Sequence, residues 1–434
     1  MRRVINVGTT GDATSRTAAP RATARADALR GAASETMLRT RAVHAGTDAT
    51  LPVWTLSQPI ATSTVYAFRD PTVADLRATA DPPEPNYVRD GMPNVRALER
   101  AVADLEGAEG AHAVGSGMAA IALTFLTHLR AGDHVIAYAD DYCETRTLLT
   151  EELPRFGVRT TLIEAGDPRA LEAACCRETR MVYVETIANP SLRLADLEAL
   201  ARFTQDHGLL LCVDNTFATP VLCRPLAYGA DLVLHSATKF LGGHHDLIAG
   251  IVAGRRELID PICRYGRLYG MTLGAMDAWL ALRGLHTLAP RMAWMSDTAS
   301  AIAAFLHSHP AIAAVHYPGL PDHPDAALAR RLLPTGAGAM LAFDLRDGPP
   351  AAARLIRTLQ LIPYALSLGG TASTVCYPPH VQTADGDGND FAALGSATIR
   401  MSVGLEAADD LIADLAQALA VLDCRPHLGC SAIG

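Results

Sequence analysis

Lysine is almost absent from this sequence. The 37 Lys and Arg residues of the 434-residue chain include a single lysine, Lys239. Arginine cannot replace an amine that must lose its proton and attack a carbonyl, because guanidinium stays charged. Lys239 lies in a mostly apolar stretch, GADLVLHSATKFLGGHHDLIAG (229–250), and apolar surroundings lower the pKa of an amine. We therefore predict that Lys239 is a nucleophile or a Schiff-base partner; the alternative is a surface lysine beside a turn.

Other absences exclude whole classes of protein. No apolar run reaches the roughly 18 residues that span a bilayer, so a soluble protein without a membrane partner is expected. The net charge of −9 disfavours binding to nucleic acid or to anionic membranes. The nine cysteines form no repeated C-x-x-C pattern, and an odd count is a poor disulfide framework. Free thiols in the cytoplasm are the simpler interpretation.

Length and composition indicate a globular protein of two or three packed units, since 434 residues exceed the usual size of a single core. Residues 1–36 are rich in Ala, Arg and Thr and resemble a disordered extension. A transit peptide, or a true start at Met37, is the alternative. We expect an N-terminal arm over 37–95, a cofactor-binding α/β domain over 96–290 and a C-terminal α/β domain over 291–434.

The central part of the chain alternates between strand-like and helix-like runs. A helix is predicted over VRALERAVADLEG, with Asn94 as its N-cap and Gly107 as its stop. The short apolar runs that follow predict seven strands, at 111–114, 134–139, 159–165, 180–186, 209–215, 232–237 and 247–254. Apolar runs without polar alternation, joined by helices, favour a mostly parallel seven-stranded sheet covered on both faces. Ligands bind such sheets at the carboxyl ends of the strands, so the site is expected in the loops after 114, 139, 186, 214 and 236.

The loop after the first strand, GSGMAA (115–120), enters a helix. Backbone N–H groups at a helix N-terminus suit a phosphate. The loop also fits the G-x-G-x-x-A dinucleotide fingerprint, with Asp140 and Asp141 as loose candidates for the ribose. This loop alone therefore leaves a nicotinamide enzyme open.

Asp214 ends the fifth apolar run, in CVDNTFATP (212–220). A carboxylate at the end of a buried strand requires a cation or a strong donor, and a protonated pyridine nitrogen is such a partner. A helix cap or a turn is the alternative. With Lys239 to hold an aldehyde, and the hydroxyls of Ser236 and Thr238 to hold a phosphate, the residues together predict pyridoxal 5′-phosphate (PLP).

These residues lie within a longer series of motifs that resembles the Cys/Met-metabolism PLP enzymes of fold type I, the group of cystathionine γ-synthase, cystathionine γ-lyase, methionine γ-lyase and O-acylhomoserine sulfhydrylase. The motifs run from about Thr40 to about Leu422: TRAVHAG (40–46), YVRDGMPN (87–94), LEGAEGAHAVGSGMAAI (105–121), ETIANP (185–190), VDNTFATP (213–220), GADLVLHSATKFLGGHHD (229–246), VHYPGLPDH (315–323), SLGG (367–370) and IRMSVGLE (399–406).

The resemblance implies a role for each matching residue toward the cofactor ring. Lys239 would form the Schiff base and shuttle protons, Asp214 would hold the pyridine N–H, Asn189 would bond the ring hydroxyl, and Tyr142 would stack on the ring.

Toward the phosphate, the resemblance implies backbone donors, side-chain hydroxyls and two residues that reach the site of a neighbouring subunit; these are Gly117 and Met118, Ser236 and Thr238, and Tyr87 and Arg89. The site would be built across a dimer, and the family usually forms a tetramer, a dimer of dimers.

Toward the substrate, the resemblance assigns the α-carboxylate to Arg400, with Ser367 near it. The departures from the family pattern also concern the substrate: Glu144 follows the stacking tyrosine, and Leu366 stands where cystathionine γ-lyases tend to carry Glu. Glu144 could contact the substrate amine, orient Tyr142 or face solvent. An apolar wall at Leu366 favours a small or apolar γ-substituent over cystathionine. The adjacent His244 and His245 would point apart, so no metal site is expected.

The implied activity is PLP-dependent γ-elimination or γ-replacement on a γ-substituted L-amino acid of the homoserine or methionine type. It would run through an aldimine on Lys239 and a vinylglycine-type intermediate. The alternatives are cystathionine γ-synthase or O-acylhomoserine sulfhydrylase proper, a β-lyase on the same fold, and a lyase that releases an ester or a halide. A nicotinamide enzyme is the alternative from another class.

Overall fold

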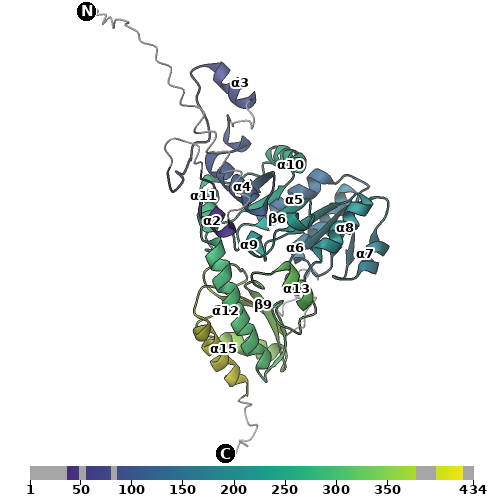
Figure 1. Cartoon of the computed structure of the whole chain (residues 1–434), viewed down its shortest axis with the longest axis vertical. Helices are drawn as coiled ribbons and strands as arrows, with labels where there is room; N and C mark the ends of the chain where they lie inside the picture. The colour runs from purple at the N-terminus through teal and green to yellow at the C-terminus, as the bar shows by residue number, and fades with distance from the viewer. Residues whose placement is uncertain (1–36, 48–54, 80–85, 378–396, 424–434) are drawn as a thin grey trace, which may run out of the picture.

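The computed structural model describes residues 37–47, 55–79, 86–377 and 397–423, which form a large α/β unit and a smaller unit with its own sheet (Figure 1). The predicted extension over residues 1–36 lies outside the described residues.

The large unit is built on a seven-stranded sheet. Its strands are β1 (Gly110–Val114), β2 (His134–Tyr138), β3 (Arg159–Ile163), β4 (Thr179–Glu185), β5 (Leu210–Asp214), β6 (Leu232–Ser236) and β7 (Gly250–Gly254), in the order β1-β7-β6-β5-β4-β2-β3. The pairs from β3 to β6 are parallel, and β7 is antiparallel to both of its neighbours. The prediction of a mostly parallel seven-stranded sheet is confirmed, although β7 begins at Gly250 rather than at 247.

The strands read as continuous apolar runs because helices bury both faces of the sheet. Successive side chains of a strand point to opposite faces: Met181 and Tyr183 of β4 enter the core beneath α5 (Gly117–His128) and α10 (Arg256–Tyr269). Val182 and Val184 enter the core on the other face, with α4 (Pro93–Glu106), α8 (Leu197–His207) and α11 (Ala275–Leu285). Because helices cover both faces of the sheet, a ligand site is left to the edge where the strands end and the loops meet.

The predicted start of α4 is wrong in one detail. The N-cap is Met92, without a side-chain cap, and Pro93 takes the first helical position, where its missing N–H costs nothing. The Asn94 side chain is instead fully buried and binds the arm, accepting from the Ala61 N–H at 2.8 Å and donating to the Pro59 carbonyl at 2.9 Å. The predicted stop is confirmed, since Gly107 ends the helix with a positive φ of 77°.

Short elements complete the arm and the large unit: α2 (Leu38–Val43), α3 (Pro71–Thr79), η1 (Val88–Asp90), α6 (Cys143–Thr147), η2 (Leu148–Glu152), η3 (Leu153–Phe156), α7 (Pro168–Ala174), α9 (Thr219–Leu222) and η4 (Pro225–Tyr228). Figure 1 shows α3 standing away from the rest of the molecule.

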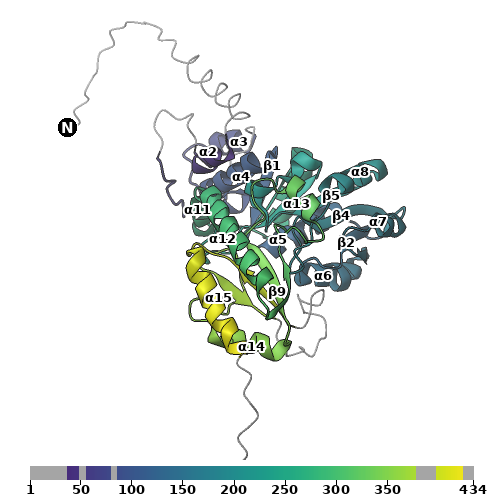
Figure 2. The same ribbon diagram turned by 60° about the horizontal axis from the view of Figure 1, so that its bottom comes forward.

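The smaller unit has a four-stranded antiparallel sheet in the order β10-β11-β9-β8. Its strands are β8 (Ile312–His316), β9 (Met340–Leu345), β10 (Thr374–Cys376) and β11 (Thr398–Ser402), and its helices are α12 (Leu288–Ser308), α13 (Ala326–Leu332), α14 (Pro349–Thr358) and α15 (Ala408–Asp423). In Figure 2, α12 and α15 lie beside β9.

Helix α12 belongs to both units. Leu288, Met292 and Met295 pack into the core of the large unit, whereas Ile302 and Leu306 pack into that of the smaller one. The proposed domain boundary at 290/291 therefore falls in the first turn of this helix, and the change of core comes about two turns later. The division into domains stays a prediction.

Candidate functional site

A cavity of about 410 Å³ opens at the carboxyl ends of the parallel strands. Residues from all five predicted loops line it, among them Gly117, Tyr142, Asn189, Asp214 and Lys239. The smaller unit closes the other side with Leu366, Leu368 and Arg400. The structure therefore brings most of the predicted site residues together between the two units.

Lys239 follows β6 in a tight turn, and its Nζ donates to the Ser367 hydroxyl at 3.2 Å. The buried Arg291 guanidinium of α12 holds the next residues of the turn, with 2.8 Å from Nη1 to the Phe240 carbonyl and 3.4 Å from Nη2 to that of Leu241. The backbone that follows the amine is thus fixed by one buried guanidinium, which suits a group that must meet a substrate atom at one place.

Asp214 is the last residue of β5, and burial raises the pKa of its carboxyl group. Its oxygens accept from the Thr216 N–H at 2.9 Å and, more weakly, from the Tyr183 hydroxyl at 3.5 Å. No ion pair holds it within the described residues. A buried carboxylate in this state would be stabilised by a cationic N–H such as that of a pyridinium.

Glu185, the last residue of β4, positions two other residues of the cavity. Its carboxylate accepts from the Tyr142 N–H at 2.9 Å and from the Asn189 N–H at 2.8 Å. Burial, together with the nearby charges of Asp141 and Asp214, raises the pKa of Glu185. One side chain thus fixes the loops after β2 and β4 relative to each other.

The start of α5 forms the phosphate end of the cavity. Ser116 caps the helix by accepting from the Ala119 N–H at 3.0 Å, and the N–H groups of Gly117 and Met118 donate to no acceptor among the described residues. A Cβ on Gly117 would meet the Ser236 Cβ at 2.8 Å, so only glycine lets this helix approach β6. The Thr238 hydroxyl is engaged with the Ala249 backbone, with oxygen-to-nitrogen and oxygen-to-oxygen distances of 3.0 and 3.2 Å.

Arg400 of β11 lies at the other end of the cavity and is only 4% exposed. Nη1 donates to the Asn189 amide oxygen at 2.6 Å and Nη2 to the Leu366 carbonyl at 3.3 Å. A buried guanidinium that faces a cavity is suited to bind a carboxylate through two parallel hydrogen bonds.

Four predicted residues do not line this cavity. Ser367 is one of them, although it contacts Lys239 Nζ. Glu144 is exposed on α6 and does not line it. Tyr87 is 42% exposed and stacks beneath the Arg89 guanidinium, 5.2 Å from the ring centre. Arg89 instead lines a second cavity of about 600 Å³ between α4, β1 and α10. Within one chain, neither Tyr87 nor Arg89 reaches Lys239.

Leu366 does line the cavity, at its mouth, and is 70% exposed.

His244 binds the Gly242 carbonyl at 2.8 Å, while the His245 ring lies against Gly370. In the part of the chain that the structure describes, no group of three or more His, Cys, Asp or Glu side chains is placed to hold a metal ion.

Sequence reasoning missed several cavity residues, of which Glu185 has the clearest structural role; the others are Ser116, Ile121, Ile187, Thr216, Phe217, Ile248 and Leu368. The signal for Glu185 was present, because it is an acid at the end of a buried apolar strand, as Asp214 is. The apolar residues carried no distinguishing signal, since their types are those of any core.

The donor set fits PLP. One cavity, at the carboxyl ends of the strands, brings together four kinds of group. They are an amine, a carboxylate without an ion pair, a helix N-terminus with two unused N–H groups and a buried guanidinium. This fold and this site define a PLP-dependent enzyme of fold type I.

The chain belongs to the Cys/Met metabolism PLP-dependent enzyme family, which matches residues 39–420. It is 39% identical over 387 residues to L-methionine gamma-lyase of Fusobacterium nucleatum, covering 88% of this chain and 98% of the relative. It is 39% identical over 397 residues to O-succinylhomoserine sulfhydrylase of Pseudomonas aeruginosa, covering 91% and 97%. It is 41% identical over 337 residues to cystathionine beta-lyase MetC of Bacillus subtilis, covering 77% and 86%.

A solved structure agrees with this assignment. The crystal structure of metB from Corynebacterium glutamicum matches with a TM-score of 0.83 and 35% identity, over 90% of this chain and 99% of that one. The predictions of family, fold class, enzyme class and cofactor are confirmed, and the nicotinamide alternative is not supported. Asp141, one candidate for a ribose, is buried and accepts from the N–H groups of Tyr138 and Glu185 at 3.1 and 3.2 Å. Among the described residues no helix is long and apolar enough to cross a bilayer.

Proposed function

We propose that this enzyme removes or replaces the γ-substituent of an L-amino acid of the homoserine or methionine type. The observation that carries the proposal is that one amine, Lys239, and one buried guanidinium, Arg400, line the same cavity, which has an apolar mouth. The geometry provides for one amino-acid head group and for a side chain that is compact or apolar.

We assign the cofactor contacts as follows. Lys239 carries the covalent attachment, Asp214 pairs with the ring nitrogen, and Asn189 and Tyr142 hold the ring hydroxyl and the ring face. The Gly117 and Met118 N–H groups and the Ser236 and Thr238 side chains hold the phosphate. When bound, PLP supplies an electron sink that stabilises negative charge on the carbon atoms next to the substrate nitrogen.

The protein's own groups then divide the remaining work. Arg400 binds the α-carboxylate and, through its hydrogen bond to Asn189, fixes that end of the substrate. Once the substrate amine has displaced it from the cofactor, Lys239 Nζ removes the proton from the α-carbon and passes that proton on to the cofactor. As a neutral amine again, it then removes a proton from the β-carbon, which allows the γ-substituent to leave. Ser367 accepts from the amine at 3.2 Å and aims it when it is not engaged with substrate.

The mouth of the cavity supports a preference among substrates. Leu366 and Ile248 are 70% and 58% exposed there, so a thioether or another apolar substituent gains contact area. The charged distal end of cystathionine finds apolar surface instead and loses hydration. We propose that a compact γ-substituted amino acid is turned over faster than cystathionine. Glu144 faces solvent and carries no part of this preference.

The test is a panel of L-amino acids with γ-substituents and, separately, β-substituents, each with and without an added thiol. Release of 2-oxo acid and ammonia from methionine-type substrates supports elimination, and capture of the thiol supports replacement. Faster turnover of S-substituted cysteines would instead assign the chain to β-elimination.

The substrate preference has its own variant. Leu366→Glu should improve kcat/KM for cystathionine relative to methionine about tenfold. The new carboxylate would give the charged distal end of cystathionine a polar partner, which Leu366 does not provide. Leu361→Glu, at another exposed leucine of the smaller unit that does not line the cavity, is the matched control. An unchanged ratio in Leu366→Glu would remove Leu366 from the argument.

We further propose that the enzyme is a homo-oligomer, a dimer of dimers, in which Tyr87 and Arg89 serve the cavity of the neighbouring subunit. Neither residue lines the cavity around Lys239 of the same chain, which supports this, and so does the arm, which exposes Leu56 and Val65 by 90% and 63%. Apolar side chains on an extended arm are typical of a surface that a second subunit covers.

We also propose a cytoplasmic location. It is supported by the absence of disulfide bonds among five of the described cysteines, which are Cys175, Cys176, Cys212, Cys223 and Cys263.

A further inference from the structure

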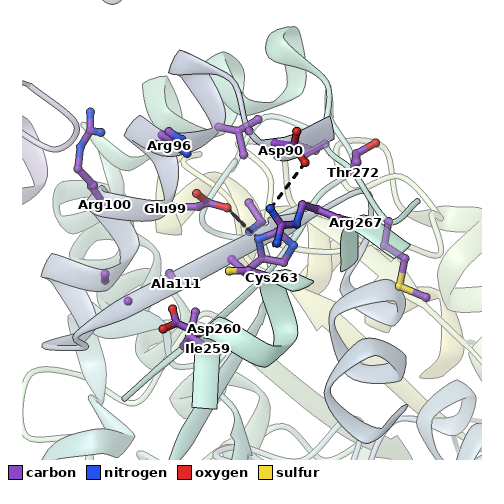
Figure 3. Close-up of a pocket in the computed structure, with 18 of the residues that line it drawn as sticks. Asp90, Arg96, Glu99, Arg100, Ala111, Ile259, Asp260, Cys263, Arg267 and Thr272 are labelled. Carbon is purple, nitrogen blue, oxygen red and sulfur yellow. Dashed lines mark hydrogen bonds and ion pairs between the residues drawn. The ribbon is translucent and has the colours of Figure 1, made fainter. Parts of the chain in front are cut away.

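The second cavity contains a thiol, an imidazole and a carboxylate from three different elements. His112 projects from β1, Glu99 from α4 and Cys263 from α10. Figure 3 shows Glu99 and Cys263 directed toward the same part of the cavity, with Arg267 beside them. None of these side chains takes part in the site around Lys239.

Glu99 fixes the imidazole. Its Oε1 lies 3.1 Å from His112 Nδ1 and accepts from the Ala113 N–H at 3.0 Å. The ring is therefore held with Nδ1 toward the carboxylate, and Nε2 points the other way. A carboxylate on Nδ1 stabilises the protonated ring and sets its orientation.

Nε2 of His112 is buried and makes no hydrogen bond of good geometry within the described residues. The ring lies against α10 where that helix has no side chain, since a Cβ on Gly266 would meet Nε2 at 2.6 Å. Cys263 is three residues earlier on α10 and is partly exposed, so it lies on the same face of the helix.

The electrostatics favour a charged pair. Burial alone would lower the pKa of His112, but the Cys263 thiol and the Glu99 carboxylate outweigh it and raise the pKa to about 10. A protonated imidazole beside a thiol stabilises the thiolate, which is the reactive form of cysteine.

The walls of the cavity select the charge of a ligand. Arg89 also lines it, but we assign that residue to the neighbouring subunit, which leaves four arginines and four carboxylates. Asp90 pairs with Arg267 at 3.6 Å and Glu99 with His112. The other charged groups are three arginines, Arg96, Arg100 and Arg256, and two carboxylates, Glu109 and Asp260. Their net positive charge attracts an anion toward the thiol.

We propose that Cys263 is a reactive thiol, activated by His112 and Glu99, that exchanges with small anionic disulfides entering the second cavity. The thiol proton passes from Sγ to His112 Nε2. The thiolate attacks one sulfur of the disulfide, a Cys263–sulfur bond forms, the sulfur–sulfur bond of the reagent breaks, and the second sulfur leaves as a thiolate with the electron pair. The disulfide is the oxidant, and the mixed disulfide on Cys263 is the product.

The test compares thiols within one protein. The assembled, PLP-loaded enzyme is treated at neutral pH with dithiobis(nitrobenzoate), an anionic disulfide, or with cystamine, a cationic one, and is digested without reductant. Cleavage at arginine places Cys263 alone in 257–264 and Cys175 with Cys176 in 170–177. The second peptide is the reference, because burial raises the pKa of the Cys175 thiol.

We expect Cys263 to be labelled at least about tenfold faster than the reference pair, and faster by the anionic than by the cationic reagent. His112→Asn should slow Cys263 about tenfold and leave the reference pair unchanged. If His112→Asn proves unfolded, Arg267→Gln on the folded protein should still reduce the preference for the anionic reagent. The proposal would be overturned if Cys263 were labelled no faster than the reference pair, even if subunit association were the reason. It would also be overturned if Cys263 were labelled equally fast in wild type and in a folded His112→Asn.

Discussion

Lys239 is chemically unique in the chain because no other residue carries an amine side chain. Its turn is fixed by hydrogen bonds from Arg291, and its Nζ contacts Ser367. An imine with an aldehyde can therefore form on one side chain only, and the N-terminal amine is the sole competitor.

Borohydride reduction of the PLP-loaded enzyme should fix the cofactor on the peptide that contains Lys239. Lys239→Arg should abolish the label, because guanidinium does not form the imine. Peptide mass mapping checks both results. A label on the N-terminal peptide of the wild type would contradict the assignment.

Glu185→Gln tests whether one carboxylate holds two loops. Glutamine has a single acceptor oxygen, so one of the two hydrogen bonds, from Tyr142 N–H or from Asn189 N–H, is lost. We expect the free energy of unfolding to fall by about 1–3 kcal/mol and PLP to be retained less tightly, as measured by denaturant melts and equilibrium dialysis. Glu178→Gln, an exposed partner of Arg159 at 3.6 Å, is the control; equal effects in both variants would refute the special role of Glu185.

The site residues that were predictable are those with unusual chemistry for their surroundings. Lys239 stood out by rarity, and Asp214 by its charge at the end of a buried run. Glu144 was considered for the substrate because it is two residues from Tyr142, but Tyr142 precedes α6 as its N-cap whereas Glu144 lies in the first turn of the helix and is exposed. Contacts between distant residues, such as Arg400 with Asn189, have no local signal in the sequence.

At the scale of elements, the strands were predictable because each is buried on both faces and reads as a continuous apolar run. The start of α4 was not, because Pro93 replaces a side-chain cap and frees Asn94 to hold the arm. The sharing of α12 between two cores was not predictable either. Its apolar residues surround the helix, and no pattern tells which unit each one enters.

Helix α13 is joined to the large unit by an ion pair. Asp325 accepts from Arg193 Nε at 2.6 Å, from Arg193 Nη2 at 3.1 Å and from the Leu194 N–H at 3.0 Å. Burial alone would raise the pKa of Asp325, but these donors outweigh it and hold the pKa below its ordinary value of 3.8. The carboxylate thus stabilises the fold above that value and ceases to do so as the pH falls through the lowered pKa.

Asp325→Asn should lower the free energy of unfolding at pH 7 by about 1 kcal/mol, a modest figure because Arg193 is partly exposed. The difference from wild type should shrink as the pH is lowered below 3.8. Urea melts across that range measure it. Asp322→Asn, at an exposed neighbour of His307, should have no effect; a difference for Asp325→Asn that does not depend on pH would assign its effect to packing instead.

At the scale of the whole molecule, the proposed shared site predicts complementation. Arg89→Ala and Lys239→Ala should each lose activity alone. Subunit exchange between them should restore it in hybrid dimers, in one of the two sites, because that site then has Lys239 from one chain and Arg89 from the other. Activity assays after exchange, verified by mass-tagged subunits, check this; no recovery would mean that each site is complete within one chain.

Helix α12 has a consequence for how the enzyme unfolds. Because its first half is core for the large unit and its second half is core for the smaller one, neither unit can melt without exposing apolar surface of the other. The two units therefore form one cooperative unit rather than two separate foldons. The cavity between them, which needs Lys239 from one unit and Arg400 from the other, is kept intact by the same cooperativity until the molecule unfolds as a whole.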